Sequence, residues 1–185
     1  LITWQGPNTR NDIPATYAAD VFSFILSQRS SEFQKHMIES GLALQVNLGY
    51  QTNKFVGLIT LFLVPNPAKI KEAYAQLEKE INKWDSDDYF TDEQLETAKT
   101  MLAIQEAYGK EQTSQFLHTV TYWWASASID YYIDYVENLN KVTRADIKRY
   151  VDTYIKGKPY VSGILLSPGM QEQMEIESLQ AYLGK

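Results

Sequence analysis

The sequence changes its hydrophobic period at Leu42, and this change constrains the fold more than any other feature. Residues 42–51 alternate apolar side chains with small or polar ones, which predicts a half-buried strand. After a turn at Thr52-Asn53, residues 54–64 are apolar at both parities, as in a strand that is centrally placed or covered on both faces. The two segments together predict a β-hairpin.

Helix signals lie on both sides of this hairpin. Pro14 suits the first turn of a helix that extends to about Ser27. The motif S-x-x-Q at residues 31–34 has the form of a reciprocal N-terminal cap, so a helix is expected over 32–40. Gly41 would end that helix in a left-handed conformation.

The remaining helices follow the hairpin. One is predicted from Asn66-Pro67 to Trp84, because its apolar residues recur at steps of four and three, and Glu80 is expected on its solvated face. A second reciprocal cap at Thr91 begins a helical region that is expected to continue to about residue 128. Two more helices are predicted over 129–140 and from Thr143 to the break at Gly157.

Strand-like segments stand near the two ends of the chain, at residues 1–4 and 160–166. Together with the hairpin and the helices between them, they predict an α+β fold of two layers, with helices packed on one face of a mainly antiparallel sheet. The 185 residues are expected to form one domain, with residues 168–185 as a tail that is possibly helical. Because the chain enters directly into an apolar strand, we expect it to be part of a longer protein.

Composition excludes several classes of function. The chain has 17 basic and 23 acidic residues, a net charge of −6, which disfavours a nucleic-acid partner. It contains no cysteine, so disulfides, thiolate nucleophiles and sulfur-ligated metals are excluded. The longest apolar run, residues 55–64, is about half of the roughly 20 residues that a membrane span needs. No membrane span is therefore predicted.

Two histidines limit the metal and acid–base chemistry. The segment that begins at His36 starts like the zinc motif H-x-x-E-H, but Ser40 occupies the position of the second histidine. His118 has no carboxylate near it in the sequence. A structural histidine is therefore the favoured interpretation at both positions, and no metal ligand is predicted in this chain.

Other sequence features have ordinary structural explanations. The acidic run at residues 85–93 lacks the order of an EF-hand loop, so a solvated loop before a helix N-terminus is favoured over a cation site. The aromatic segment from Tyr122 to Tyr135 has helical spacing, which favours core packing over a ligand wall. Neither a nucleophile elbow nor a phosphate-binding loop is present, which disfavours an unrelated small-molecule enzyme.

Several segments in a fixed order resemble the insulinase/pitrilysin-type zinc metallopeptidases, and the resemblance spans residues 2–166. The segments are WQGP, SSEFQKHMIESGLALQV, FVGLITLFLVPNP, FTDEQLETAK and KVTRADIKRYVDTYI. The resemblance implies a half-domain of the insulinase/mitochondrial processing peptidase type. Because H-x-x-E-H and the distal glutamate are absent, it implies the C-terminal half that binds no metal.

The resemblance also implies where the family's functional residues would stand. Its arginine falls on Met37 and its tyrosine on Leu44, with Gly41 and Leu42 matching between them. Methionine and leucine cannot donate hydrogen bonds to a developing oxyanion, so no catalytic residue is predicted here. Gly41, Leu42 and Leu44 remain predicted substrate contacts. Restoring both polar residues in a complete, zinc-loaded assembly is expected to raise peptide turnover.

The implied function is a non-catalytic, chamber-forming domain that contacts peptide substrate or a partner. Zinc is expected in a partner half, either in the same chain or in another subunit. This domain alone would not be an enzyme, whereas the parent protein would be a zinc metalloendopeptidase or a degenerate homologue. The alternative is a pseudo-peptidase scaffold or assembly subunit. By resemblance only, the bacterial periplasm or cell envelope is the expected location.

Overall fold

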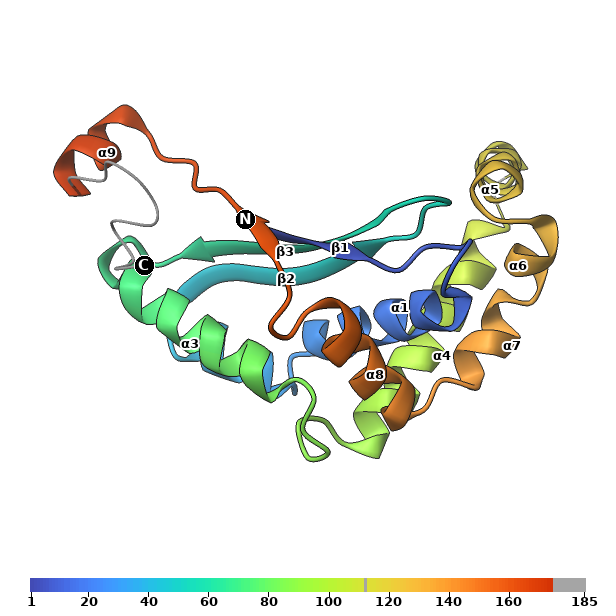
Figure 1. The fold of residues 1–185 in the computed structure, drawn as a ribbon, viewed down its shortest axis with the longest axis horizontal. Coiled ribbons are helices and arrows are strands. Elements are labelled where there is room, and N and C mark those ends of the chain that lie inside the picture. Colours follow the sequence, from blue (N-terminus) through green and yellow to red (C-terminus); the bar gives the residue numbers. More distant parts are fainter. Residues whose placement is uncertain (112, 175–185) are drawn as a thin grey trace.

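The computed structural model describes residues 1–111 and 113–174. This part of the chain folds into a four-stranded antiparallel sheet with helices on one face (Figure 1). The strand order is β2-β3-β1-β4. The strands are β1 (Ile2–Gly6), β2 (Ala43–Gln51), β3 (Gly57–Pro65) and β4 (Tyr160–Ser162). The predicted α+β class and the hairpin, β2 with β3, are confirmed.

Except for α9, which lies beyond the opposite end, the helices lie below the sheet in Figure 1 and beyond one of its ends. Under the sheet lie α1, α3 and α8, whereas α5, α6 and α7 gather near the turn that joins β2 to β3. The bounds are α1 (Ile13–Ser27), α2 (Glu32–Gln34), a π-helix η1 (Lys35–Glu39), a 3-10 helix η2 (Pro67–Lys69), α3 (Ile70–Lys83), α4 (Asp92–Gly109), α5 (Thr113–Ser126), α6 (Ile129–Ile133), α7 (Tyr135–Asn140), α8 (Arg144–Tyr154) and α9 (Pro168–Met174).

Some predicted boundaries are wrong for local physical reasons. The expected helix over 129–140 is two helices, because Asp134 has a ψ of 3° that interrupts the α-helical path. The helical region predicted from Thr91 does continue to Ser126, but as two helices, since α4 ends at Gly109, a poor helix former, and α5 follows. The strand expected over 160–166 ends at Ser162, because that residue already pairs with Ile2 at the start of β1. Helix α9 lies within the predicted tail, and residues 175–185 lie outside the described residues.

The two predicted N-terminal caps differ in detail. At Thr91 the cap is reciprocal, because the side chain accepts from Gln94 N and the Gln94 side chain accepts from Thr91 N. At Ser31 the hydroxyl accepts from Gln34 N at 3.2 Å, but the Gln34 amide donates to the carbonyl of Leu26 at 3.1 Å. The motif at Ser31 therefore fastens α2 to the end of α1.

Asp12 connects the start of α1 to α8. Its carboxylate accepts from Ala15 N at 3.3 Å and from both terminal nitrogens of Arg149 at 2.9 Å. Burial acts to raise the pKa of Asp12, but hydrogen bonds from Arg149 and Tyr154 outweigh it and lower the pKa. Asp12 is thus a helix cap that also fixes where α8 packs.

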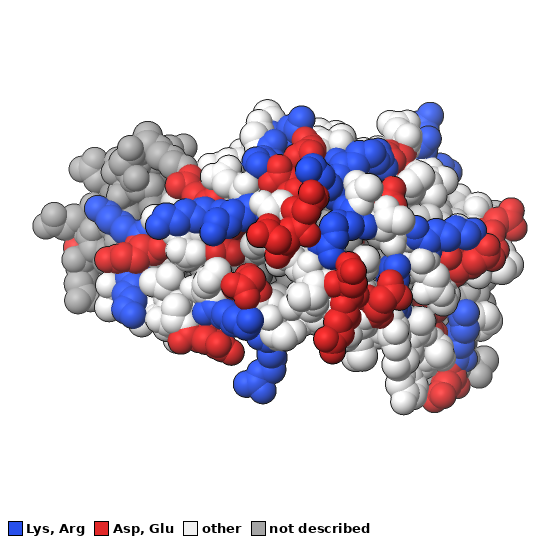
Figure 2. Space-filling model, turned by 90° about the horizontal axis from the view of Figure 1, so that it is seen from below, with Lys and Arg blue, Asp and Glu red and all other residues white. Residues whose placement is uncertain are grey.

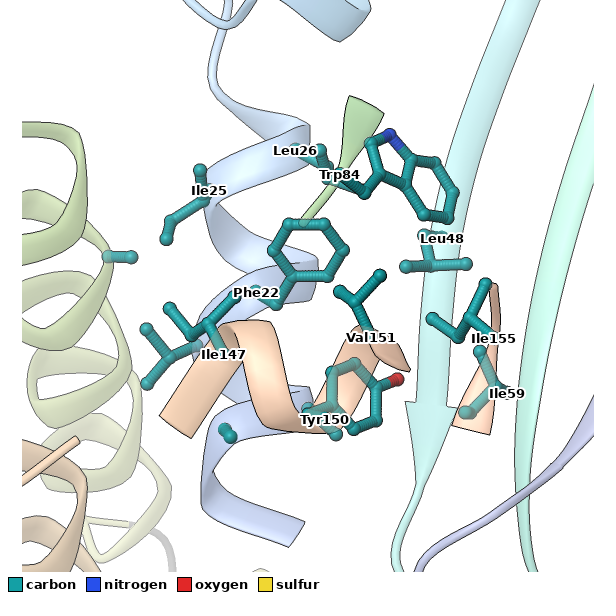
Figure 3. Close-up of a cluster of buried hydrophobic side chains, with 14 of the residues drawn as sticks. Phe22, Ile25, Leu26, Leu48, Ile59, Trp84, Ile147, Tyr150, Val151 and Ile155 are labelled. Atoms are coloured by element: carbon teal, nitrogen blue, oxygen red, sulfur yellow. The ribbon is translucent and has the colours of Figure 1, made fainter. Parts of the chain in front are cut away.

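The core forms where α1, α8 and the sheet meet (Figure 3). Phe22 on α1 makes edge contacts with Trp84 and Tyr150, at ring-centroid distances of 5.5 and 6.2 Å. Leu48 and Ile59 cover this cluster from the sheet. Each such side chain contributes about 1.5–3 kcal/mol by leaving water, so this junction holds the two layers together.

We predict that Tyr150→Phe leaves the free energy of unfolding unchanged or raises it by up to about 1 kcal/mol. The Tyr150 hydroxyl is buried without a hydrogen-bond partner, so removing it abolishes a desolvation cost and no bond. Tyr131→Phe is the matched control, because that hydroxyl lies 2.8 Å from Thr16 Oγ1. The control should lose about 1 kcal/mol in urea unfolding, and an equal loss in both variants would contradict the assignment.

Candidate functional site

The segment from η1 to β2 carries the residues that the sequence singled out. Gly41 adopts a φ of +71°, the left-handed conformation predicted for it, and redirects the chain from η1 into β2. Asn66 then fastens this turn to the end of β3, since its backbone N–H donates to Leu42 O at 2.8 Å and its side chain to Gly41 O at 3.2 Å. The turn is therefore fixed by the adjacent strand.

The structure does not bring Met37 and Leu44 together. Met37 is fully buried in the core, whereas Leu44 is 69% exposed. A register shift between Ala43 and Gln45 leaves Leu44 unpaired, so that it projects away from the helical layer. Gly41 is exposed and Leu42 is partly exposed. Only the turn and Leu44 are thus available to a peptide.

Glu80 is the polar residue that sequence reasoning misplaced. It was expected on a solvated helix face, but it is fully buried. Its carboxylate accepts from Tyr89 Oη at 2.6 Å and Gln76 Nε2 at 2.7 Å, and its Oε1 lies 2.8 Å from Nδ1 of the partly exposed His36. The spacing contained a signal, because Glu80 stands three residues after Leu77 and four before Trp84, both buried.

Residues of the acidic run at 85–93 form ion pairs. Asp85 accepts from Lys156 at 2.6 Å, and Asp92 accepts from Arg144 at 2.7 Å. His118 is exposed, and His36 belongs to the Glu80 network. Among residues 1–111 and 113–174, no group of three His, Asp or Glu side chains is arranged to hold a metal ion.

The face of the sheet that the helices leave open is uncharged and mixes apolar side chains with polar ones such as the exposed Gln45 and Asn47 of β2. Leu58, Phe62 and Val161 are 44%, 43% and 76% exposed there, between neighbours that face the core. Residues 54–64 were predicted to form a strand that is either centrally placed or covered on both faces. Strand β3 is centrally placed, but the described residues cover only one of its faces. None of the residues in β1 to β4 is charged. The helical side, by contrast, carries interspersed charges of both signs (Figure 2).

The two edges of the sheet are also open in the described structure. Strand β2 pairs with β3 on one side only, and β4 pairs with β1 on one side only. Leu44 stands on the free edge strand β2, one residue from its start. An unpaired strand of this kind offers backbone donors and acceptors to an extended peptide.

The aromatic segment packs partly in the core, as predicted, and partly borders a hollow. Tyr131 packs in the core, stacked on Tyr17 at a centroid distance of 5.0 Å. Trp124 is 71% exposed, while Trp123 and Tyr135 border a hollow beside Asp20. Burial raises the pKa of Asp20 to about 7, and the hydrogen bond from Tyr135 Oη at 2.7 Å opposes this only in part.

Comparison with known proteins identifies the chain. The sequence profile described as peptidase M16 inactive domain matches residues 1–102, more than half of the chain. This chain belongs to that family, the inactive C-terminal domains of the insulinase/pitrilysin-type zinc metallopeptidases. No curated protein matches it in a sequence search.

Solved structures confirm the fold. The inactive peptidase domain of a candidate zinc protease from Bordetella parapertussis superposes with a TM-score of 0.74 at 15% identity, over 88% of this chain and 86% of that one. A protease from Helicobacter pylori gives a TM-score of 0.67 at 18% identity, over 84% of this chain but only 38% of its own length. A chain of complex III2 from Candida albicans gives 0.68 at 13% identity, over 86% and 40% respectively. This chain therefore spans well under half the length of the last two proteins.

Among the described residues, no helix is both long enough and apolar enough to cross a lipid bilayer.

We predict that Met37→Arg destabilises the fold by at least about 3 kcal/mol, because it places an unpaired guanidinium in the core. Leu44→Tyr should change stability by no more than about 0.5 kcal/mol, since the side chain is exposed. Urea unfolding of the two single variants measures both values. The expected gain in turnover from the double replacement therefore requires a fold that tolerates this loss, and a fully stable Met37→Arg variant would contradict the predicted destabilisation.

We predict that the free energy of unfolding of Asp20→Asn exceeds that of the natural protein by a margin that grows with pH. Between about pH 4 and 7 the margin should grow by about 1.4 kcal/mol for each pH unit. The sign follows because the folded carboxyl holds its proton up to about pH 7, whereas the unfolded one releases it near pH 4. The difference should be constant above about pH 8. Urea midpoints of the two proteins across pH 4–9 test this, and parallel curves would disprove it.

Proposed function

We propose that this chain is the non-catalytic half of a peptidase chamber, which pairs with a zinc-bearing half and holds peptide without cutting it. The zinc half would lie in the same polypeptide or in a separate subunit. The observation that carries this proposal is the uncharged open face of the sheet, with its exposed apolar side chains at Leu58, Phe62 and Val161. Membership of the inactive M16 domain family supports the same assignment.

The open sheet face has the composition of a surface that becomes buried. Protein interfaces exclude charged residues from their centres and enrich aromatic and aliphatic ones. Phe62, Leu58 and Val161 provide the apolar side chains, and the strands carry no charge. The mixed charges of the helical side instead suit contact with solvent. We therefore assign the sheet face to the partner or the chamber interior.

The free edge of β2 supports a peptide-binding role. Main-chain hydrogen bonds to an edge strand bind an extended peptide without any catalytic group. Gly41, Leu42 and Leu44 lie at the start of this edge, so the predicted substrate contacts stay together even though Met37 does not. A peptide aligned there would be held by backbone atoms while the zinc half supplied the chemistry.

A pseudo-peptidase scaffold is the second candidate. It is favoured by the absence of a hydrogen-bonding side chain at positions 37 and 44, and by the fold shared with a chain of complex III2 from Candida albicans. A scaffold would use the same open face for assembly. Zinc content separates the two proposals.

We predict near-stoichiometric zinc in the full-length protein purified with its natural partners and without chelator. The isolated 185-residue chain, measured in the same way by mass spectrometry of the metal, should contain almost none. Zinc in the full assembly supports a peptidase chamber. Its absence from both samples would reject the chamber and favour the scaffold.

We predict that Phe62→Lys in the same full assembly weakens pairing with the zinc half and lowers peptide turnover at least tenfold, because a buried unpaired ammonium opposes association. The matched control is Met101→Lys, which is similarly exposed at 49% but lies on α4 in the helical layer. Both variants should keep the circular dichroism spectrum of the natural chain. Equal turnover in the two variants would remove the sheet face from the interface.

A further inference from the structure

A cavity of about 340 Å³ opens between α1, α4, α5, α7 and the end of β2. Its volume lies within the range of roughly 300–1,000 Å³ that small-ligand sites occupy. Aromatic and acidic side chains dominate its wall. The lining residues are Asp20, Phe24, Tyr50, Gln51, Thr52, Leu102, Gln105, Glu106, Tyr122, Trp123 and Tyr135.

Two acidic residues, Asp20 and Glu106, line this cavity, and the lining includes neither lysine nor arginine. Glu106 is paired with Lys110, whose Nζ lies 3.5 Å from Glu106 Oε1. Within the described part of the chain, Asp20 has no basic partner and accepts one hydrogen bond, from Tyr135 Oη at 2.7 Å. The cavity thus offers one carboxyl group, that of Asp20, to a cation from outside the chain.

The aromatic walls of the cavity indicate which kind of cation would bind there. The faces of tyrosine, tryptophan and phenylalanine rings attract organic cations, and a guanidinium also stacks on them because it is planar and weakly hydrated. The fixed fork of guanidinium donors also suits a carboxylate such as Asp20. A lysine ammonium would satisfy the charge but is more strongly hydrated and cannot stack.

We propose that this cavity binds the guanidinium group of an arginine side chain, which Asp20 pairs with and the aromatic rings enclose. If the proposed peptide-binding function holds, the arginine belongs to the bound peptide, because the cavity adjoins Gln51 and Thr52 at the end of the edge strand β2. Only this assignment of the arginine to a peptide rests on the proposed function. Binding of the side chain itself needs neither the zinc half nor the sheet edge.

The titration of Asp20 predicts that arginine binding depends on pH. The groups around Asp20 are acidic or phenolic, and among the described residues only Tyr135 stabilises its negative charge, through one hydrogen bond. They are Tyr17 on α1, Tyr50 on β2, Glu106 on α4, Tyr131 on α6, Tyr135 on α7 and Tyr150 on α8. The pKa of Asp20 is raised to about 7, so the carboxylate that arginine requires forms between pH 6 and 8. Arginine keeps its own charge throughout this range.

The test is titration of the 185-residue chain with N-acetyl-arginine amide, followed by NMR shifts of the Trp123 indole and of the backbone amides of Asp20 and Glu106. We expect saturable shifts with a dissociation constant on the order of 1 mM at pH 8, as the size of the probe suggests. The constant should rise roughly tenfold at pH 6. N-acetyl-citrulline amide, which has the same shape without the charge, should cause no saturable shift. N-acetyl-lysine amide should bind several-fold more weakly than the arginine probe.

Variants complete the test. Asp20→Asn should abolish binding, whereas Asp88→Asn, the same change at an exposed acid away from the cavity, should leave the dissociation constant unchanged. Equal binding of citrulline and arginine, or binding independent of pH, would overturn the proposal on the natural chain even if Asp20→Asn failed to fold. Arginine binding together with a zinc-free full assembly would keep this site and reject only the chamber.

Discussion

The packing of α1 against the sheet is the interaction on which the rest of this structure depends. Phe22 meets Trp84 from the end of α3 and Tyr150 from α8, while Leu48 and Ile59 cover the same cluster from the strands. The Asp12–Arg149 pair then fixes α8 at the start of the same helix. Because these contacts use one face of the sheet completely, the opposite face has no partner from the described chain. The functional surface is in this sense a result of how the core is built.

Much of the fold could be predicted because its signals are local. The two-residue period of β2, the caps at Thr91 and Ser31 and the left-handed Gly41 each depend on neighbours in sequence. Glu80 could not be placed so easily, because its burial depends on Tyr89 and His36 from other segments. The separation of Met37 from Leu44 depends on a π-helix and a bulge, two departures from regular geometry that the sequence pattern does not reveal. Asp20 gave no motif, since its significance comes from what surrounds it.

Two buried positions of this domain differ in what burial does to the fold. A methionine in the core at position 37 stabilises the fold where a polar residue would have to reach the surface. The carboxylate of Asp20 does the opposite, because it is kept in a hollow where burial works against its charge. Chains usually retain such a costly group where it does something besides stabilise the fold.

The open edges of the sheet have a consequence for how such a chain is made. Strands β2 and β4 end the sheet without a lysine or a glutamate that would repel another copy, and the strands between them carry no charge either. Two newly folded copies could therefore join edge to edge as readily as one copy could meet its proper partner. Linking the two halves in one polypeptide, or synthesising them side by side, raises the local concentration of the correct partner and lets it arrive first.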